Sequence, residues 1–268
     1  WASTISAALS CLKAVLTDPD VPFNEGAKRP VTISGPLGSL VNPVRPAGVR
    51  ARMAVCNRIH NALMDALAKA VPDRVIGFGF DTTTAITFSQ LKPEGFRIHL
   101  EVLGGGFGAS AKADGAEAIA IPLSNCTNAP IESVEADYDY VRIRAFRLLP
   151  DSFGDGKFRG GAGYEREYEI VRDDVRTAYY SDRYDSRPKG VFGGEPGSSG
   201  SAVVIQNGRP VALRPKGDLT LNRGDRIVLR MGGGGGYGAP ADRSPRLREQ
   251  DRLNGLVTSS ADIAEIAS

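Results

Sequence analysis

The chain has 268 residues, of which 41% are apolar, and its 33 Lys and Arg nearly balance 31 Asp and Glu. This length and composition allow one large domain or two small ones with a real core. Since no block of like charge occurs and no apolar stretch approaches roughly 18 residues, we expect no nucleic-acid partner and no membrane span. Three scattered cysteines without a CxxC pair argue against a disulfide scaffold or zinc cluster and favour the cytoplasm.

The first 72 residues predict helices around a proline-rich stretch. Apolar residues recur at three- and four-residue spacing over 2–16, which predicts a helix. Five prolines within 21–46 exclude a helix there and leave one short strand at 31–34. The helical period returns over 49–71. We therefore assign residues 1–72 to a helical and proline-rich segment.

From residue 73 the pattern changes to short strands rich in β-branched and aromatic residues. The predicted strands are 74–80, 85–90, 96–103, 139–148, 164–171, 176–181, 202–206, 210–214 and 226–231. A tight turn at 222–225 predicts a hairpin between 219–221 and 226–229. The predicted fold is α+β: N-terminal helices, then a β-rich domain over 73–240 of mainly antiparallel sheets with glycine-rich loops, and a helical tail over 241–268.

Four glycine clusters hold 20 of the 32 glycines. They span 104–108, 154–163, 190–200 and 232–238. A flexible linker interleaves Gly with Ser over a long stretch, whereas these clusters are short and stand between patterned segments. Such glycines mark backbone with positive φ or backbone that approaches a neighbour closely. We therefore predict loops of a folded domain.

The first of these clusters predicts an anion site. A strand that runs into bare glycines presents backbone N–H groups to a phosphate or a developing oxyanion. The predicted donors are Gly104, Gly105, Gly106 and Gly108. Glu101 before the loop and Asp114 after it can supply carboxylates for proton transfer or for a divalent cation. A tight turn flanked by surface charges is the structural alternative.

Other polar residues carry weaker signals. The chain has two histidines, His60 and His99, so a three-histidine zinc site within the chain is excluded. We interpret both histidines as structural. Cys126 has no histidine nearby in the sequence and is interpreted as a structural thiol. Its neighbour Asn125 is a candidate polar contact. Hydroxyls at 81–84 follow a predicted strand and are compatible with a simple turn.

Six motifs occur in a fixed order along nearly the whole chain. They lie at 21–26, 38–43, 104–109, 149–163, 190–197 and 232–240. In this order they resemble the signature of the hydantoinase B/oxoprolinase family. The resemblance covers the C-terminal half of a typical member, and the chain begins at Trp1 without a methionine. We therefore expect a processed or partial chain whose N-terminal half lies elsewhere.

The resemblance implies an ATP-dependent enzyme that acts on a cyclic amide such as 5-oxoproline or a hydantoin. A hydantoinase A-like partner subunit is expected to bind ATP with Mg and to phosphorylate the amide oxygen. The B-type part then helps to bind and hydrolyse the activated ring, with the predicted glycine donors, Glu101, Asp114 and Asn125 at the site. Any divalent metal is expected in the missing half, with no metal ligands here.

Two alternatives remain open. Ketone carboxylases of the same family phosphorylate an enolate instead and transfer a carboxyl group to it. The other alternative is a non-catalytic scaffold segment that builds a subunit interface.

Overall fold

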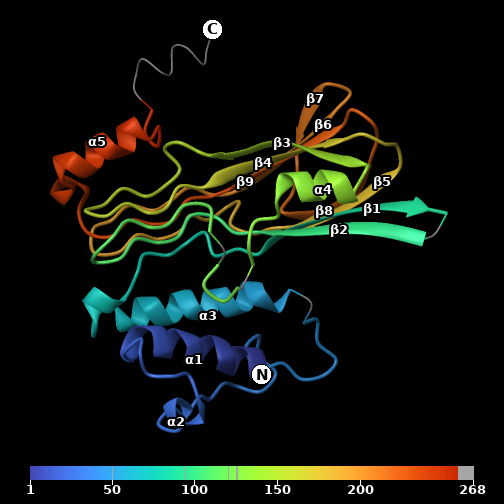
Figure 1. The fold of residues 1–268 in the computed structure, drawn as a ribbon. Coiled ribbons are helices and arrows are strands. Elements are labelled where there is room, and N and C mark those ends of the chain that lie inside the picture. Colours follow the sequence, from blue (N-terminus) through green and yellow to red (C-terminus); the bar gives the residue numbers. More distant parts are fainter. Residues whose placement is uncertain (50, 94, 120, 125, 259–268) are drawn as a thin grey trace.

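The computed structural model describes residues 1–258 except 50, 94, 120 and 125, and it has the predicted α+β fold (Figure 1). The α-helices are α1 (Ala2–Leu16), α2 (Glu25–Lys28), α3 (Arg52–Leu67), α4 (Ile131–Asp137) and α5 (Pro245–Leu253). The strands are β1 (Thr84–Lys92), β2 (Gly95–Leu103), β3 (Val141–Leu148), β4 (Tyr164–Ile170), β5 (Val175–Tyr180), β6 (Ser201–Gln206), β7 (Arg209–Ala212), β8 (Lys216–Leu221) and β9 (Arg226–Met231). Short 3-10 turns lie at Pro72–Arg74 and Pro240–Asp242.

The strands form two antiparallel sheets that share one core. Their strand orders are β2-β1-β5-β8 and β3-β4-β9-β6-β7. Phe88 of β1 packs in the same fully buried cluster as Tyr168 of β4, and their ring centroids lie 5.0 Å apart. The two sheets are therefore the halves of a sandwich, with α4 contributing Val134 to its core.

The helices α1 and α3 form a separate layer, which Figure 1 shows below the strands. Cys11 and Val15 of α1 pack with Met64 of α3 in a small core of their own. This core also includes Val75, which follows the 3-10 turn. Within the described ranges, no helix is long and apolar enough to cross a membrane.

Extended segments from the four glycine clusters come together, and these segments are here called the glycine bundle (104–109, 154–163, 190–197 and 232–238). Their backbones hydrogen-bond directly to one another. The N–H of Gly106 donates to the carbonyl of Gly232 at 3.0 Å, and that of Gly234 donates to Gly161 at 2.9 Å. The N–H of Gly236 donates to Glu195 at 2.9 Å. Figure 1 shows these segments side by side beyond one end of the sheets.

Close approach explains most of these glycines. A Cβ added at Gly106 would lie 2.0 Å from the carbonyl oxygen of Gly161, and one at Gly234 would lie 2.0 Å from that of Phe107. Neither glycine has a positive φ. The bundle therefore needs residues without a side chain rather than residues with unusual backbone angles.

Two strand predictions and the hairpin prediction are wrong. Residues 31–34 form no strand, and the predicted strand 74–80 makes only an isolated bridge, between Ile76 and Ser110. Gly77 donates instead to the Ala109 carbonyl at 2.8 Å, so this segment joins the glycine bundle. The turn at 222–225 exists, but β8 and β9 lie in different sheets, so it carries the chain across the sandwich.

Candidate functional site

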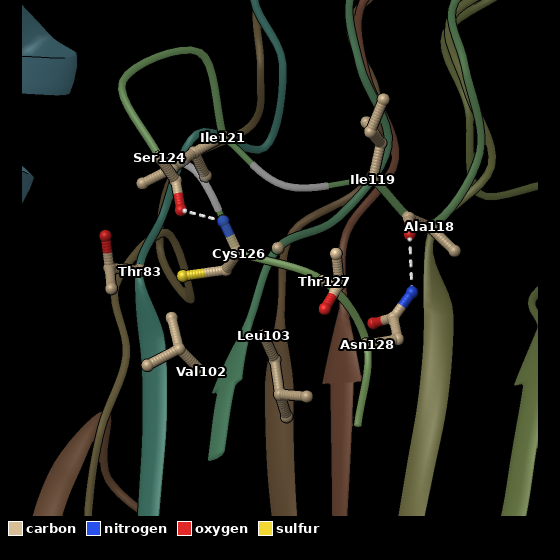
Figure 2. Close-up of a pocket in the computed structure, with 11 residues that line it drawn as sticks. Thr83, Val102, Leu103, Ala118, Ile119, Ile121, Ser124, Cys126, Thr127 and Asn128 are labelled. Atoms are coloured by element: carbon tan, nitrogen blue, oxygen red, sulfur yellow. Dashed lines mark hydrogen bonds between the residues drawn. The ribbon is translucent and has the colours of Figure 1, made fainter. Parts of the chain in front are cut away.

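A pocket of about 270 Å³ lies where β1 begins and β2 ends (Figure 2). Its apolar wall includes Val102, Leu103 and Ile121. The polar lining consists of Thr83, Gly104, Ser124, Cys126, Thr127 and Asn128. Three motifs that are far apart in the sequence therefore meet here: the hydroxyls before β1, the first glycine after β2 and the polar loop.

Thr83 supplies a buried hydroxyl to the polar part of this lining. The residue is 9% exposed, and its Oγ1 has no hydrogen-bond partner among the residues that the structure describes. An unmade hydrogen bond on a buried group costs about 1–3 kcal/mol, so a ligand that pairs with this hydroxyl recovers that cost. Figure 2 shows the Cys126 thiol pointing toward the side of the pocket where Thr83 stands. The Asn128 side chain donates to the Ala118 carbonyl at 3.2 Å and braces the loop.

A buried polar network fixes the backbone next to Thr83. Asp81 is 4% exposed and has a φ of 44°. Arg58 donates to the Asp81 carbonyl at 2.6 Å. Asn61, with its amide oriented to suit both neighbours, donates to the Asp81 carboxylate at 2.9 Å and accepts from Arg183 at 2.8 Å. Burial raises the pKa of Asp81 against the opposing charges of Arg183 and Arg58, and burial lowers the pKa of Arg183 to about 10.

Glu101 lies inside the sandwich and not in the pocket. It accepts hydrogen bonds from Arg166 at 2.7 Å and from Tyr168 at 2.6 Å. Burial opposes its charge, but hydrogen bonds from His99 and Tyr168 and the charge of Arg166 together lower its pKa. Arg166 also donates to the Ala129 carbonyl at 3.3 Å, next to the pocket loop. These contacts make Glu101 part of a buried hydrogen-bond network, and its role in proton transfer stays a prediction.

Asp114 belongs to a different network at the C-terminal helix. Arg243 donates to its two oxygens at 2.7 and 2.9 Å, and the backbone N–H of Arg159 donates at 2.8 Å. Both arginines also pair with Asp251 of α5. Asp114 thus ties the glycine bundle to α5. The structure does not bring it into one network with Glu101, and its catalytic role also stays a prediction.

The predicted glycine donors divide into two kinds. Gly104 lines the pocket. The N–H of Gly105 donates to the Ile119 carbonyl at 3.1 Å, and the N–H of Gly106 is used within the bundle. A Cβ at Gly108 would lie 1.7 Å from the Gly77 carbonyl oxygen, so Gly108 serves close packing. Asn125 lies outside the described residues, and its predicted contact stays a prediction.

Both histidines of the chain are buried. His99 stacks on Phe88, with ring centroids 6.4 Å apart, and His60 is buried in α3. Among the residues that can be described, no cluster of three or more His, Cys, Asp or Glu can hold a metal ion.

Sequence reasoning missed the arginines and the asparagine that support the pocket. A signal was present in α3, where Asn57, His60 and Asn61 fall at i, i+3 and i+4 beside the apolar positions. All three are buried. Polar residues on the buried face of a helix indicate a polar network behind it.

The fold and the pocket define an α+β domain in which a sandwich and a glycine bundle meet at a small polar site. The sequence model of the hydantoinase B/oxoprolinase family matches residues 1–240. This chain belongs to that family, as the ordered motifs predicted.

Relatives of known sequence cover almost all of this chain. An uncharacterized protein of Methanocaldococcus jannaschii is 34% identical over 92% of this chain and 43% of its own length. A Pseudomonas protein, provisionally named as the B-type component of a D-/L-hydantoinase, is 31% identical over 95% of this chain and 44% of its own. The 5-oxoprolinase of Dictyostelium discoideum is 26% identical over 88% of this chain and 18% of its own length. The chain thus spans less than half the length of these relatives.

Two solved structures share the fold. The ATP-dependent caprolactamase of Pseudomonas jessenii superposes with a TM-score of 0.83 and 28% identity, covering 95% of this chain and 46% of its own. An acetone carboxylase superposes with a TM-score of 0.81 over 95% of this chain and 39% of its own. Because its identity is 19%, the second likeness shows the fold alone.

Proposed function

We propose that this chain is part of an ATP-dependent enzyme that hydrolyses a cyclic amide, of the hydantoinase or 5-oxoprolinase type. The observation that carries the proposal is the likeness to an ATP-dependent caprolactamase over 95% of the chain. Relatives named as a hydantoinase component and a 5-oxoprolinase support the same reaction class. Caprolactam, hydantoins and 5-oxoproline, after which these three proteins are named, are all cyclic amides.

ATP supplies the activation that such a substrate needs. An unstrained amide is a poor electrophile, and transfer of a phosphoryl group to its oxygen makes the amide carbon reactive toward water. After water adds, the ring C–N bond breaks and the nitrogen leaves as the amine, which produces an acyl phosphate. Attack of a second water on the carbonyl carbon of that acyl phosphate gives the carboxylate and releases the former amide oxygen in inorganic phosphate. We assign ATP and Mg to a hydantoinase A-like partner subunit, and any divalent metal to the half of the B-type protein that this chain does not cover. The proposed assembly therefore needs more than one polypeptide segment for turnover.

Within this chain, the proposed substrate contact is the pocket at Thr83. Its hydroxyl and the backbone at Gly104 offer hydrogen bonds to the polar edge of the ring, and Asn125 is proposed as a further contact. Glu101 does not contact the substrate in this proposal. It holds Arg166, which donates to the Ala129 carbonyl beside the pocket loop. In this proposal Thr83 and Gly104 bind the cyclic amide, while Glu101 positions the pocket loop through Arg166.

The reaction class is tested by ATP turnover in the purified complex. We expect ATP hydrolysis to be stimulated by 5-oxoproline or by a hydantoin, with release of the ring-opened product. Stimulation by a ketone with bicarbonate alone would assign the complex to the carboxylases of the family. ATP hydrolysis that responds to none of these substrates would refute both enzyme assignments.

The Thr83 contact is tested by replacing its hydroxyl with a methyl group of equal size. We expect Thr83→Val to raise the KM for the cyclic amide about tenfold, which corresponds to about 1.4 kcal/mol. Thr177→Val is the matched control, because Thr177 is also buried and its hydroxyl also has no partner in the described structure. Equal kinetics for the two variants would contradict the assignment of the pocket.

A scaffold role is the second candidate. It is favoured by the pairing of Glu101 and Asp114 with arginines and by the use of the Gly105 and Gly106 N–H groups inside the fold. A scaffold predicts that Thr83→Val leaves kcat and KM unchanged while the complex still assembles. Size-exclusion chromatography of the same preparations reports that assembly.

A further inference from the structure

A second cavity, of about 320 Å³, lies on the other side of the pocket loop, between the helical layer and the glycine bundle. Its walls are largely apolar and include Val15, Met64, Ile76, Phe107 and Leu123. Leu123 is two residues from Ile121, which lines the Thr83 pocket. The short loop between them is therefore a wall of both spaces.

One buried imidazole lines this apolar cavity. His60 is 5% exposed, and its Nδ1 has no hydrogen-bond partner among the described residues. Met64, one helical turn later on α3, lines the same cavity, so both side chains belong to one face of the helix. A buried nitrogen without a partner costs about 1–3 kcal/mol, which a ligand hydrogen bond would offset.

The charge of the cavity favours an uncharged ligand. Burial lowers the pKa of His60, so the imidazole is neutral near neutral pH. The cation among the lining residues, Arg74, is exposed, and its guanidinium donates to the Thr17 carbonyl at 2.7 Å. A cavity of about 150 Å³ can hold benzene, so this volume accommodates a five- to seven-membered ring.

We propose that this cavity is a second binding site, which holds the neutral cyclic amide with its ring against Phe107 and Met64 and its amide hydrogen-bonded to His60. The choice of a cyclic amide as the ligand rests on the proposed function. Binding here requires no ATP, because the ring is taken up before its amide oxygen is phosphorylated. The site is thus distinct from the Thr83 pocket, although the two share one loop.

The two histidines of the chain make this proposal directly measurable. In the 268-residue chain labelled with 15N-histidine, His60 and His99 give two sets of imidazole signals. We expect ε-caprolactam and hydantoin, both uncharged near neutral pH and added without nucleotide, to shift the His60 signals in a saturable way. The signals of His99, which is buried in the sandwich, should stay in place.

A filling variant provides the control. Ala14 lines the cavity from an exposed position on α1, so Ala14→Phe should fill the space without disturbing the core and weaken binding at least tenfold. Ala2→Phe makes the same change at an exposed position of α1 outside the cavity and should leave binding unchanged.

Three results would overturn the site: no saturable shift of His60, equal shifts of both histidines, or unchanged binding in Ala14→Phe. Measuring ATP turnover in the assembled complex distinguishes failure of the second site from failure of the proposed function. Turnover with cyclic amides in the absence of a His60 shift would refute the second site alone. A His60 shift without turnover would refute the proposed function and leave the site standing.

Discussion

The sandwich and the glycine bundle are held together in opposite ways. In the sandwich, large side chains such as Phe88 and Tyr168 fill the space between two sheets. In the bundle, backbones touch directly, as at Gly106 and Gly161, and no side chain fits between them at these contacts. A core of side chains can repack around a substitution, whereas a contact between two backbones has no freedom to adjust. The bundle should therefore be the less tolerant region.

The largest effect is expected from one methyl group in the bundle. Gly106→Ala places a Cβ 2.0 Å from the Gly161 carbonyl oxygen, and we expect a loss of more than about 5 kcal/mol in the free energy of unfolding. Gly48→Ala is the matched control, because nothing lies within 4 Å of its added Cβ. Urea unfolding followed by circular dichroism measures both. A loss below about 1 kcal/mol at Gly106 would remove the contrast between the regions.

A smaller loss is expected from the buried ion pair of the sandwich. Glu101→Gln leaves the Arg166 guanidinium, which is 1% exposed, without its counter-charge. Breaking such a pair costs about 3–5 kcal/mol, and we expect the lower end because glutamine still accepts a hydrogen bond. Adding Arg166→Met should restore part of the stability. No recovery in the double variant would show that the side chains around Glu101 cannot repack.

Asp114→Asn should cost less, about 1 kcal/mol. The Asp114 side chain is 22% exposed, and Arg243 keeps its pair with Asp251 in the variant. The same unfolding measurement applies. A loss as large as that of Glu101→Gln would mean that the link between the bundle and α5 is as important for stability as the core pair.

The smallest effect concerns pH. The folded protein lowers the pKa of Glu101, so this carboxylate stabilises the fold above its unfolded pKa and loses that contribution as pH falls through the folded pKa. The raised pKa of Asp81 acts in the opposite direction but is common to wild type and variant. The difference in stability between wild type and Glu101→Gln should therefore shrink in acid. A difference that is constant with pH would contradict the pairing.

Local patterns predicted some of these features well. The apolar period of residues 2–16 matches α1, because a helix is specified by contacts three and four residues apart. The glycine clusters marked close backbone contacts, but which clusters touch depends on the tertiary fold. For the same reason the turn at 222–225 was recognised while its two strands were wrongly paired. The Thr83 pocket depends on the register of β1 with β2, which sets Thr84 opposite Leu103.

The activation step is the central claim for function, and an oxygen-18 experiment tests it most directly. The complex is given ATP and a cyclic amide that carries 18O in its carbonyl group, and the released inorganic phosphate is analysed by mass spectrometry. If the amide oxygen accepts the phosphoryl group and leaves with it, 18O appears in the phosphate together with ring opening. Ring opening with all 18O retained in the new carboxylate would contradict the account.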